Sequence, residues 1–440
     1  MISQQNSTTQ QNGKYSTGPY LTTGVEGPDQ TQNAIRIVRW VFYAFVFSLP
    51  FETAFEGLLE PTSILGGLLL LTTLLQPGIF LRWPPKAYLC FLVYLYLFAA
   101  FTVLEPSQYR SLSIQSLFVL AQLTVLGWIA YCVMRDRHVA ARALLTFGAA
   151  CTVMAIVQVT GVASQVAEGH SEIVRMTAFG FHPNALARLL MLGLLAIIGL
   201  SLARRKSLLT SLLVAFPFVA LLGVGLIQTG SRGGLLALMM GLMTFVLRPG
   251  TTRTKILNTM GILLMVVFIG VATLLSGVMT ARFEETLEDG DLARRERIYP
   301  AAFEMFQEKP FLGWGPITST YELGMRLGHP EEETKNPHNL ILFGFVTTGL
   351  LGSLPLFMGI GLAVIGSWRT RHGAHGSLPL AMLVAVMAAN MSGLYLFNKL
   401  HWLVMAYAMA SVSYVPLKEY ARSAARPKRV SVNAESYASV

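Results

Sequence analysis

Runs of about 20 mostly apolar residues recur along almost the whole sequence, and they constrain the fold more than any other feature. As a helix, each run is long enough to cross roughly 30 Å of hydrocarbon. Only 13% of the residues are charged and 53% are hydrophobic, whereas soluble domains carry about 25% charged residues. The sequence therefore predicts an all-α, polytopic integral membrane protein.

We expect about 12 transmembrane helices in this chain. The predicted spans cover residues 35–53, 62–81, 87–104, 112–134, 139–160, 183–203, 207–228, 233–248, 256–278, 338–366, 377–394 and 400–417. The span that starts at residue 338 is long enough to tilt or to contain a break at Pro355. The three cysteines all fall inside predicted spans, where we expect them to act as small apolar fillers.

The basic residues orient these spans, because Lys and Arg collect on the cytoplasmic side of a membrane. With the N-terminus inside, the basic residues gather in the inner loops and the acidic residues in the outer loops. This topology explains the net charge of +10 better than nucleic-acid binding does. Residues 1–34 are predicted to be a disordered cytoplasmic tail, 35–417 the transmembrane domain and 418–440 a basic cytoplasmic tail.

Two predicted outer loops, 161–182 and 279–337, are longer than simple turns, and loops of that length tend to be functional. The longer loop is partly helical by pattern. Apolar residues recur at helical spacing within it, at Ile298, Ala301, Ala302, Met305 and Phe306. This helix either roofs a cavity at the membrane surface or packs on the bundle with a purely structural role.

The outer turn Thr229–Gly234, TGSRGG, places Arg232 among glycines that let another group approach the backbone. A guanidinium offers a planar fork of donors that suits phosphate oxygens, and it keeps its charge. The alternative is an arginine that snorkels from a helix end, with small residues easing helix packing.

The segment Arg175–Arg188, RMTAFGFHPNALAR, ends the loop 161–182 and begins the next span. Pro183 suits the first turn of a helix, which His182 or Asn184 would help to cap. Arg175 is either a second phosphate or sugar contact or a solvated loop residue.

The segment NPHNLIL places His338 at the start of an apolar span. We expect Asn336 to be the N-cap and Pro337 the first helical residue, so that His338 takes the second position. There the positive end of the helix dipole would keep the imidazole neutral and able to accept a proton. The alternative is a histidine that helps to cap its own helix or bonds a loop carbonyl.

These motifs together resemble the O-antigen ligase and polymerase superfamily. The similar segments are GSRGGLLAL at 230–238, RIYPAAFEMFQEKPFLGWGP at 297–316, PHNLILFGFVTTGLLG at 337–352 and GFHPNALA at 180–187. Their order, spacing and common side of the membrane suit this family, and the predicted core is 207–366 with the periplasmic loop 279–337.

The resemblance implies a periplasmic glycosyltransferase of the bacterial inner membrane that uses an undecaprenyl-diphosphate-linked glycan as donor. The acceptor would be lipid A core in a ligase, another lipid-linked repeat unit in a polymerase, or a protein hydroxyl. The family's residues map onto His338 as the catalytic base and onto Arg232 and Arg175 as diphosphate ligands. Further candidate contacts are Arg188, which competes with Arg175, together with His182, Asn339 and Arg297.

This chemistry requires no metal and no other cofactor, because arginines neutralise the leaving diphosphate and a histidine takes the proton of the acceptor hydroxyl. The acidic run Glu288, Asp289 and Asp291 is interpreted as a solvated turn. A lipid-linked glycan transporter is the rival hypothesis from another class. A transporter would more naturally show charges in mid-span and broken helices in related halves of the chain.

Overall fold

The computed structural model describes residues 28–52, 60–80, 83–162, 164–167, 175–203, 208–247, 252–289, 295–328 and 333–414. Regular structure in these ranges is helical apart from one antiparallel hairpin. Up to that hairpin the elements are α1 (Pro28–Ser48), the 3-10 turn η1 (Leu49–Phe51), α2 (Pro61–Leu74), α3 (Pro77–Phe80), α4 (Lys86–Leu104), α5 (Ser107–Met134) and α6 (Arg137–Thr160).

The hairpin pairs β1 (Ser164–Ala167) with β2 (Arg175–Ala178), in a register that sets Ser164 opposite Ala178. The remaining elements are α7 (Pro183–Ala203), α8 (Leu208–Gln228), α9 (Arg232–Met243), η2 (Thr244–Leu247), α10 (Thr252–Leu274), α11 (Gly277–Asp289), α12 (Arg295–Glu308), α13 (Thr318–Arg326), α14 (Leu340–Arg369), α15 (Leu378–Ala389), α16 (Lys399–Ala410) and η3 (Ser411–Tyr414).

Each of the twelve predicted spans contains a helix of the structure, which confirms the prediction of an all-α membrane protein. Within the described ranges, five helices are long and apolar enough to cross a membrane alone, namely α4, α5, α6, α7 and α14. Residues 259–274 and 277–284 form a bent pair, with an angle of 80° at the break, that would make a sixth crossing. Twelve crossings and cytoplasmic termini therefore stay predictions. Helix α1 begins at Pro28, before the predicted end of the N-terminal tail, and residues 1–27 and 415–440 lie outside the described residues.

Helix α7 forms the centre of one half of the bundle and is buried on nearly all sides. It contacts α6, α8, α9 and α15. Small residues permit this close packing, because a Cβ at Gly193 would lie 2.6 Å from Cys151 Cβ. Cys151 is buried in the α6–α7 contact, as expected for an apolar filler.

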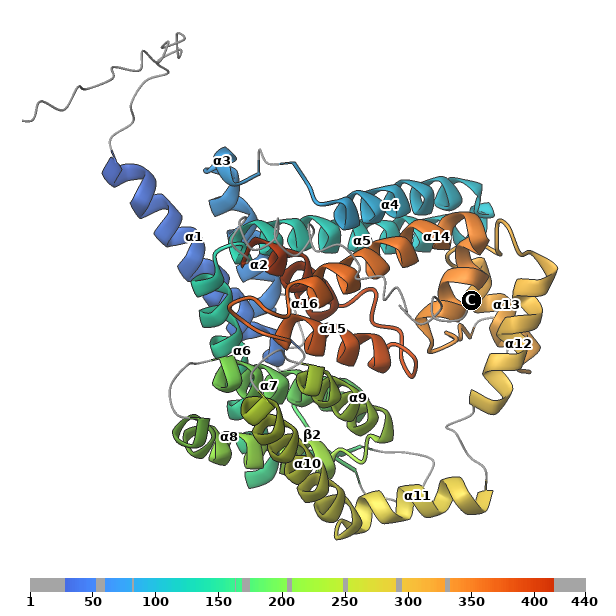
Figure 1. Cartoon of the computed structure of the whole chain (residues 1–440). Coiled ribbons are helices and arrows are strands. Elements are labelled where there is room, and N and C mark those ends of the chain that lie inside the picture. The colour runs from blue at the N-terminus through green and yellow to red at the C-terminus, as the bar shows by residue number, and fades with distance from the viewer. Residues whose placement is uncertain are drawn as a thin grey trace, which may run out of the picture.

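Helices α12 and α13 lie together at one end of the molecule, beside the ends of α4 and α14 (Figure 1). The predicted apolar face of α12 is confirmed for Ile298, Ala302 and Met305, which are buried against Leu323 of α13 and Val346 of α14. Helix α12 therefore packs on the bundle, and its role as the roof of a cavity stays a prediction.

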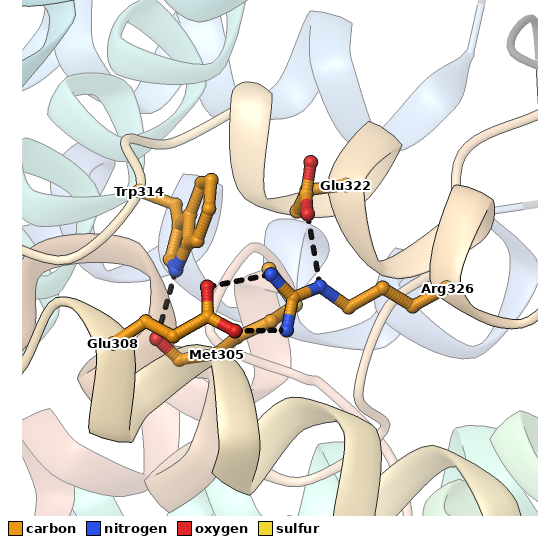
Figure 2. Close-up of polar contacts among 5 residues, drawn as sticks. All are labelled: Met305, Glu308, Trp314, Glu322 and Arg326. Carbon is orange, nitrogen blue, oxygen red and sulfur yellow. Dashed lines mark hydrogen bonds and ion pairs between the residues drawn. The ribbon is translucent and has the colours of Figure 1, made fainter.

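A charged cluster holds α12 to α13 (Figure 2). The Arg326 guanidinium binds both Glu308 oxygens, at 2.7 and 2.6 Å, and its Nε donates to Glu322 at 2.9 Å. The Trp314 indole N–H donates to the Met305 carbonyl at 2.8 Å, and Lys309 lies 3.6 Å from the centre of the Trp314 ring. These bonds orient the loop between the two helices.

Helix α14 is broken at Gly349 and not at Pro355, so the predicted position of the break is wrong. Gly349 has φ +58° and ψ −165°, a conformation that essentially only glycine adopts. Pro355 lies inside the helix without such a break.

The loop between α12 and α13 fills this break and bonds its freed backbone groups. Trp314 N and Gly315 N donate to the Val346 and Thr347 carbonyls at 2.8 and 2.9 Å. On the other side, Leu350 N and Leu351 N donate to the Pro310 and Phe311 carbonyls at 2.8 and 3.2 Å. A break inside an apolar helix is tolerated only where its polar groups find such partners.

Glu105, at the end of α4, forms hydrogen bonds with the end of the same loop that leads into α13. Its buried carboxylate accepts hydrogen bonds from Ile317 N at 2.7 Å, from Thr318 N at 3.2 Å and from the Thr318 hydroxyl. These donors belong to the start of α13, where an anion is favoured by the unpaired N–H groups and the helix dipole.

We predict that Gly349→Ala lowers the free energy of unfolding by at least about 1 kcal/mol. The backbone at residue 349 is in the left-handed region, and an added Cβ would lie 2.3 Å from the Phe311 carbonyl. Unfolding of the purified protein in detergent measures this loss. Gly361→Ala is the matched control in the same helix, since its Cβ would meet no atom within 4 Å. Equal stabilities of the two variants would contradict the proposed close approach at the break.

Candidate active site

The turn between α8 and α9 is built as the sequence predicts. Gly230 has φ +62°, and Ser231 caps α9 by accepting a hydrogen bond from Gly234 N at 3.2 Å. A Cβ at Gly233 would lie 2.5 Å from Ser392 Oγ, and one at Gly234 would lie 2.8 Å from Ala187 Cβ. The glycines thus allow α7 and the α15–α16 loop to approach this turn closely.

Arg232 begins α9 and is half-buried. Its Nη1 donates to the Arg282 carbonyl of α11 at 2.6 Å. This bond orients the guanidinium across the turn and ties the turn to α11.

Arg175, on β2, connects the same turn to the start of α7. Its Nε donates to the Thr229 carbonyl at 2.9 Å, and its Nη2 donates to Asn184 Oδ1 at 3.1 Å. Arg175 is therefore bonded within the fold and is not a solvated loop residue. The structure brings this predicted site arginine to the turn that carries Arg232.

His182 lies at the N-terminus of α7, which begins at Pro183 as predicted. Its Nδ1 accepts a hydrogen bond from Asn184 N at 3.3 Å, so it helps to cap the helix. Partial burial and the positive charge of Arg175 lower the pKa of His182 below its usual value.

The predicted helix start around His338 is wrong. Helix α14 begins at Leu340, and its N-cap is Asn339 and not Asn336. Asn339 Oδ1 accepts hydrogen bonds from Ile341 N at 2.9 Å and from Leu342 N at 3.3 Å. His338 therefore precedes the helix, and Asn339 serves the helix as its cap.

His338 adopts a left-handed backbone conformation, with φ +50°. A residue with a side chain rarely adopts this conformation, and such residues cluster at functional sites. Leu340 N donates to the Asn390 carbonyl at the end of α15, at 2.9 Å, so the fold fixes the chain on the helix side of His338. The strained position holds the imidazole outside the helix and partly exposed.

The His338 ring stays neutral to lower pH than an ordinary histidine. Partial burial lowers its pKa, and the positive charges of Arg295, His182 and Lys335 lower it further. The expected neutral imidazole thus arises from desolvation and neighbouring cations, whereas the sequence argument attributed it to the helix dipole.

Arg295 is a candidate site residue that the sequence patterns did not predict. It begins α12, acts electrostatically on His338, and its Nη2 donates to the Ser392 carbonyl at 2.7 Å. Tyr299, one turn later, donates from its hydroxyl to the Met391 carbonyl at 2.7 Å. Arg297, the candidate chosen from sequence, is exposed. No local pattern distinguishes the two arginines, because the choice depends on how α12 packs.

Arg188 lies within α7 and is only 5% exposed. Its guanidinium carbon is 3.4 Å from the centre of the Tyr395 ring, a close cation–π contact. Its Nε and Nη1 have no hydrogen-bond partner among the described residues. A buried charge with unused donors is costly, so this arginine is a strong candidate for an anion ligand.

The described residues contain no group of three His, Cys, Asp or Glu side chains that could hold a metal ion. The acidic run of the long loop falls largely outside them, since Asp291 and the side chains of Glu288 and Asp289 are not described. The residues that the structure brings together are cations and neutral imidazoles, which suit an anionic substrate.

Comparison with known families matches residues 217–357 to the O-antigen ligase family. Comparison with the curated proteins finds no match. The matched segment lies within the predicted core 207–366 and includes the turn with Arg232, helix α12, the break in α14 and His338. Arg175, His182 and Arg188 precede it. This domain covers about a third of the chain and supports membership in the O-antigen ligase superfamily.

Proposed function

We propose that the protein transfers a glycan from an undecaprenyl-diphosphate-linked donor to an acceptor hydroxyl on the periplasmic face of the inner membrane. The family match supports glycan transfer of the ligase or polymerase type. The observation that carries the proposal is the meeting of the candidate site segments. Arg175 bonds the turn of Arg232, and the start of α14, Arg295 and that same turn all contact the loop after α15 at Asn390 or Ser392.

The reaction follows from these groups. The acceptor oxygen forms a bond to the anomeric carbon while the bond from that carbon to the diphosphate oxygen breaks. The electron pair leaves with the diphosphate, and Arg232 and Arg175 balance its charge with oriented N–H donors. The acceptor proton passes to the neutral ring of His338, which acts as general base. One displacement of this kind inverts the anomeric centre and needs no metal.

Arg188 is a further diphosphate ligand in this proposal. The guanidinium of Arg175 is engaged with Thr229 and Asn184, whereas two nitrogens of Arg188 have no partner among the described residues. Arg175 then also braces the turn and the start of α7, while Arg188 supplies unused donors to the anion.

One structural feature is also expected of a transporter, because α14 is a broken helix. That break is closed by the backbone of residues 310–315, and these bonds leave its carbonyls at Val346 and Thr347 occupied. A substrate site at such a break needs open backbone groups, so this observation favours an enzyme.

Ligation to lipid A core is the first form of the proposal, and polymerisation of lipid-linked repeat units is the second. Purified protein in liposomes, supplied with lipid-linked glycan and lipid A core, tests the first form directly. A new glycosidic product is expected. Movement of the donor across the bilayer with no product would support the transporter instead, and elongation of the lipid-linked glycan would support the polymerase.

We predict that His338→Ala lowers the rate of transfer by about 10²–10⁴-fold, because the acceptor hydroxyl loses its general base. The protein should still insert into membranes and bind the lipid-linked donor. Single-turnover transfer and donor binding, measured on the same preparation, separate these effects. Wild-type turnover by this variant would exclude His338 as the base.

We predict that Arg232→Lys lowers kcat/KM by about ten- to a hundredfold although the charge is kept, because an ammonium cannot reproduce the planar fork of donors. Steady-state transfer assays measure this loss, and the folded state is checked by thermal unfolding. Full activity of the lysine variant would count against a bidentate grip on the diphosphate.

The pH profile should report on His338. The neutral ring is the active form, so kcat/KM rises with pH through the pKa of His338, with a midpoint below the usual value of 6.5. Arg295→Gln removes a neighbouring positive charge, so this midpoint should move to higher pH. Arg297→Gln is the matched control on the same helix and should leave the midpoint unchanged. An identical profile for the two variants would contradict the placement of Arg295 beside the base.

A further inference from the structure

A cavity of about 580 Å³ lies between α1, α2 and α5, outside the candidate active site. Most of its lining is apolar, from Phe45 of α1, Leu70 of α2 and a face of α5 that runs from Phe118 to Ile129. Gly66 and Gly67 leave the middle of the α2 wall without side chains. The cavity opens to the surface of the bundle, where Phe118 is 66% exposed.

Four of the five polar residues that line this cavity lie at or next to the ends of helices, and the fifth, Gln122, lies on the α5 wall. Glu52 follows α1, Thr62 and Ser63 begin α2, and Lys399 begins α16. Glu52 and Lys399 form an ion pair. From Phe118 to Ile129 the α5 wall rises about 16 Å at 1.5 Å per residue, which is roughly one leaflet of a bilayer with a core of about 30 Å. The cavity thus has the polarity and the depth of a single lipid chain with its headgroup at the Glu52 end.

One segment of the chain, residues 395–399, contacts both this cavity and Arg188. Phe397 and Lys399 line the cavity, and the same short segment carries Tyr395, whose ring covers the Arg188 guanidinium. Phe51, at the end of α1, contacts Phe179 after β2, with ring centres 6.3 Å apart. Arg188 interacts electrostatically with Glu52 and has two nitrogens without partners among the described residues. An anionic headgroup at this end would meet a buried cation.

We infer that the cavity between α1, α2 and α5 binds the polyprenyl chain of the lipid-linked donor and aligns its diphosphate with Arg188 and the candidate active site. This inference rests on the proposed function and adds the place where the apolar part of the donor is held. The headgroup of an ordinary phospholipid does not have to reach the candidate active site, whereas the diphosphate of the donor must bind there. The segment 395–399, which both lines the cavity and covers Arg188, therefore favours the donor as occupant.

Filling the cavity tests this inference. A Cβ at Gly67 would meet no atom within 4 Å, so Gly67→Phe places a ring in the cavity without a backbone clash. We expect KM for the donor to rise about tenfold with kcat nearly unchanged, because binding to the ground state and the transition state is lost equally. Val119→Trp fills the cavity from the opposite wall and should act alike. Gly361→Phe is the control, since Gly361 of α14 also has open space around it and lies outside the cavity lining.

Photo-labelling locates the chain independently of turnover. Farnesyl diphosphate, a short polyprenyl diphosphate, with a benzophenone at its chain end should label peptides of α2 and α5 in the wild-type protein, and Gly67→Phe should abolish this labelling. Unlabelled polyprenyl diphosphate should compete, and phosphatidylglycerol at the same concentration should not. Equal competition by the two lipids, labelling elsewhere, or unchanged labelling of Gly67→Phe would overturn the inference.

The outcomes for the cavity and for the proposed function are distinguishable. Transfer by a protein that is labelled elsewhere would refute the cavity as chain site and leave the enzyme intact. Labelling of α2 and α5 in a protein that makes no product would support the cavity and refute the transfer reaction.

Discussion

The backbone of α14 breaks at Gly349 in apolar surroundings, and the carbonyl and N–H groups that this break frees must find partners away from water. Residues 310–315 supply them, and Glu105 of α4 secures the start of α13 that follows. This bonding fixes α12 against α14. The position of α12 in turn brings Arg295 to His338 and to the α15–α16 loop. A constraint on helix hydrogen bonding thus determines the surroundings of the proposed catalytic base.

Positive charge gives the candidate site two properties, and Arg295 contributes to both. Arg175, Arg232, Arg188 and Arg295 concentrate positive charge where an anionic diphosphate would bind. The charges of Arg295, His182 and Lys335 also disfavour protonation of His338 and keep its ring available as a base. Binding the leaving group and preparing the base therefore draw on the same electrostatic field. A metal-independent reaction suits such a site, because charge neutralisation is supplied by fixed guanidinium groups.

Local patterns in the sequence predicted the helices, the glycine turn before Arg232 and the start of α7 at Pro183, since apolar runs, Gly and Pro determine these features directly. Tertiary contacts decided the features that were predicted wrongly. Asn336 and Asn339 can both cap a helix by their side-chain chemistry. In the structure the helix begins at Leu340, after Asn339, and Leu340 N bonds the Asn390 carbonyl, a contact made by a distant segment of the chain. The break falls at Gly349 because the Phe311 backbone packs there, a contact invisible in the local sequence. Arg295 and Arg297 are equivalent by pattern and differ only in how α12 is oriented.

The central claim is that the glycan moves in one displacement assisted by a neutral imidazole, with the diphosphate held by arginines. The anomeric configuration of the product tests it most directly. Purified protein, donor of known anomeric configuration and acceptor are incubated, and the new linkage is assigned by NMR. The account predicts the inverted configuration and no glycosylated peptide of the protein in mass spectra taken during turnover. A retained configuration, or a sugar covalently attached to the chain, would contradict it.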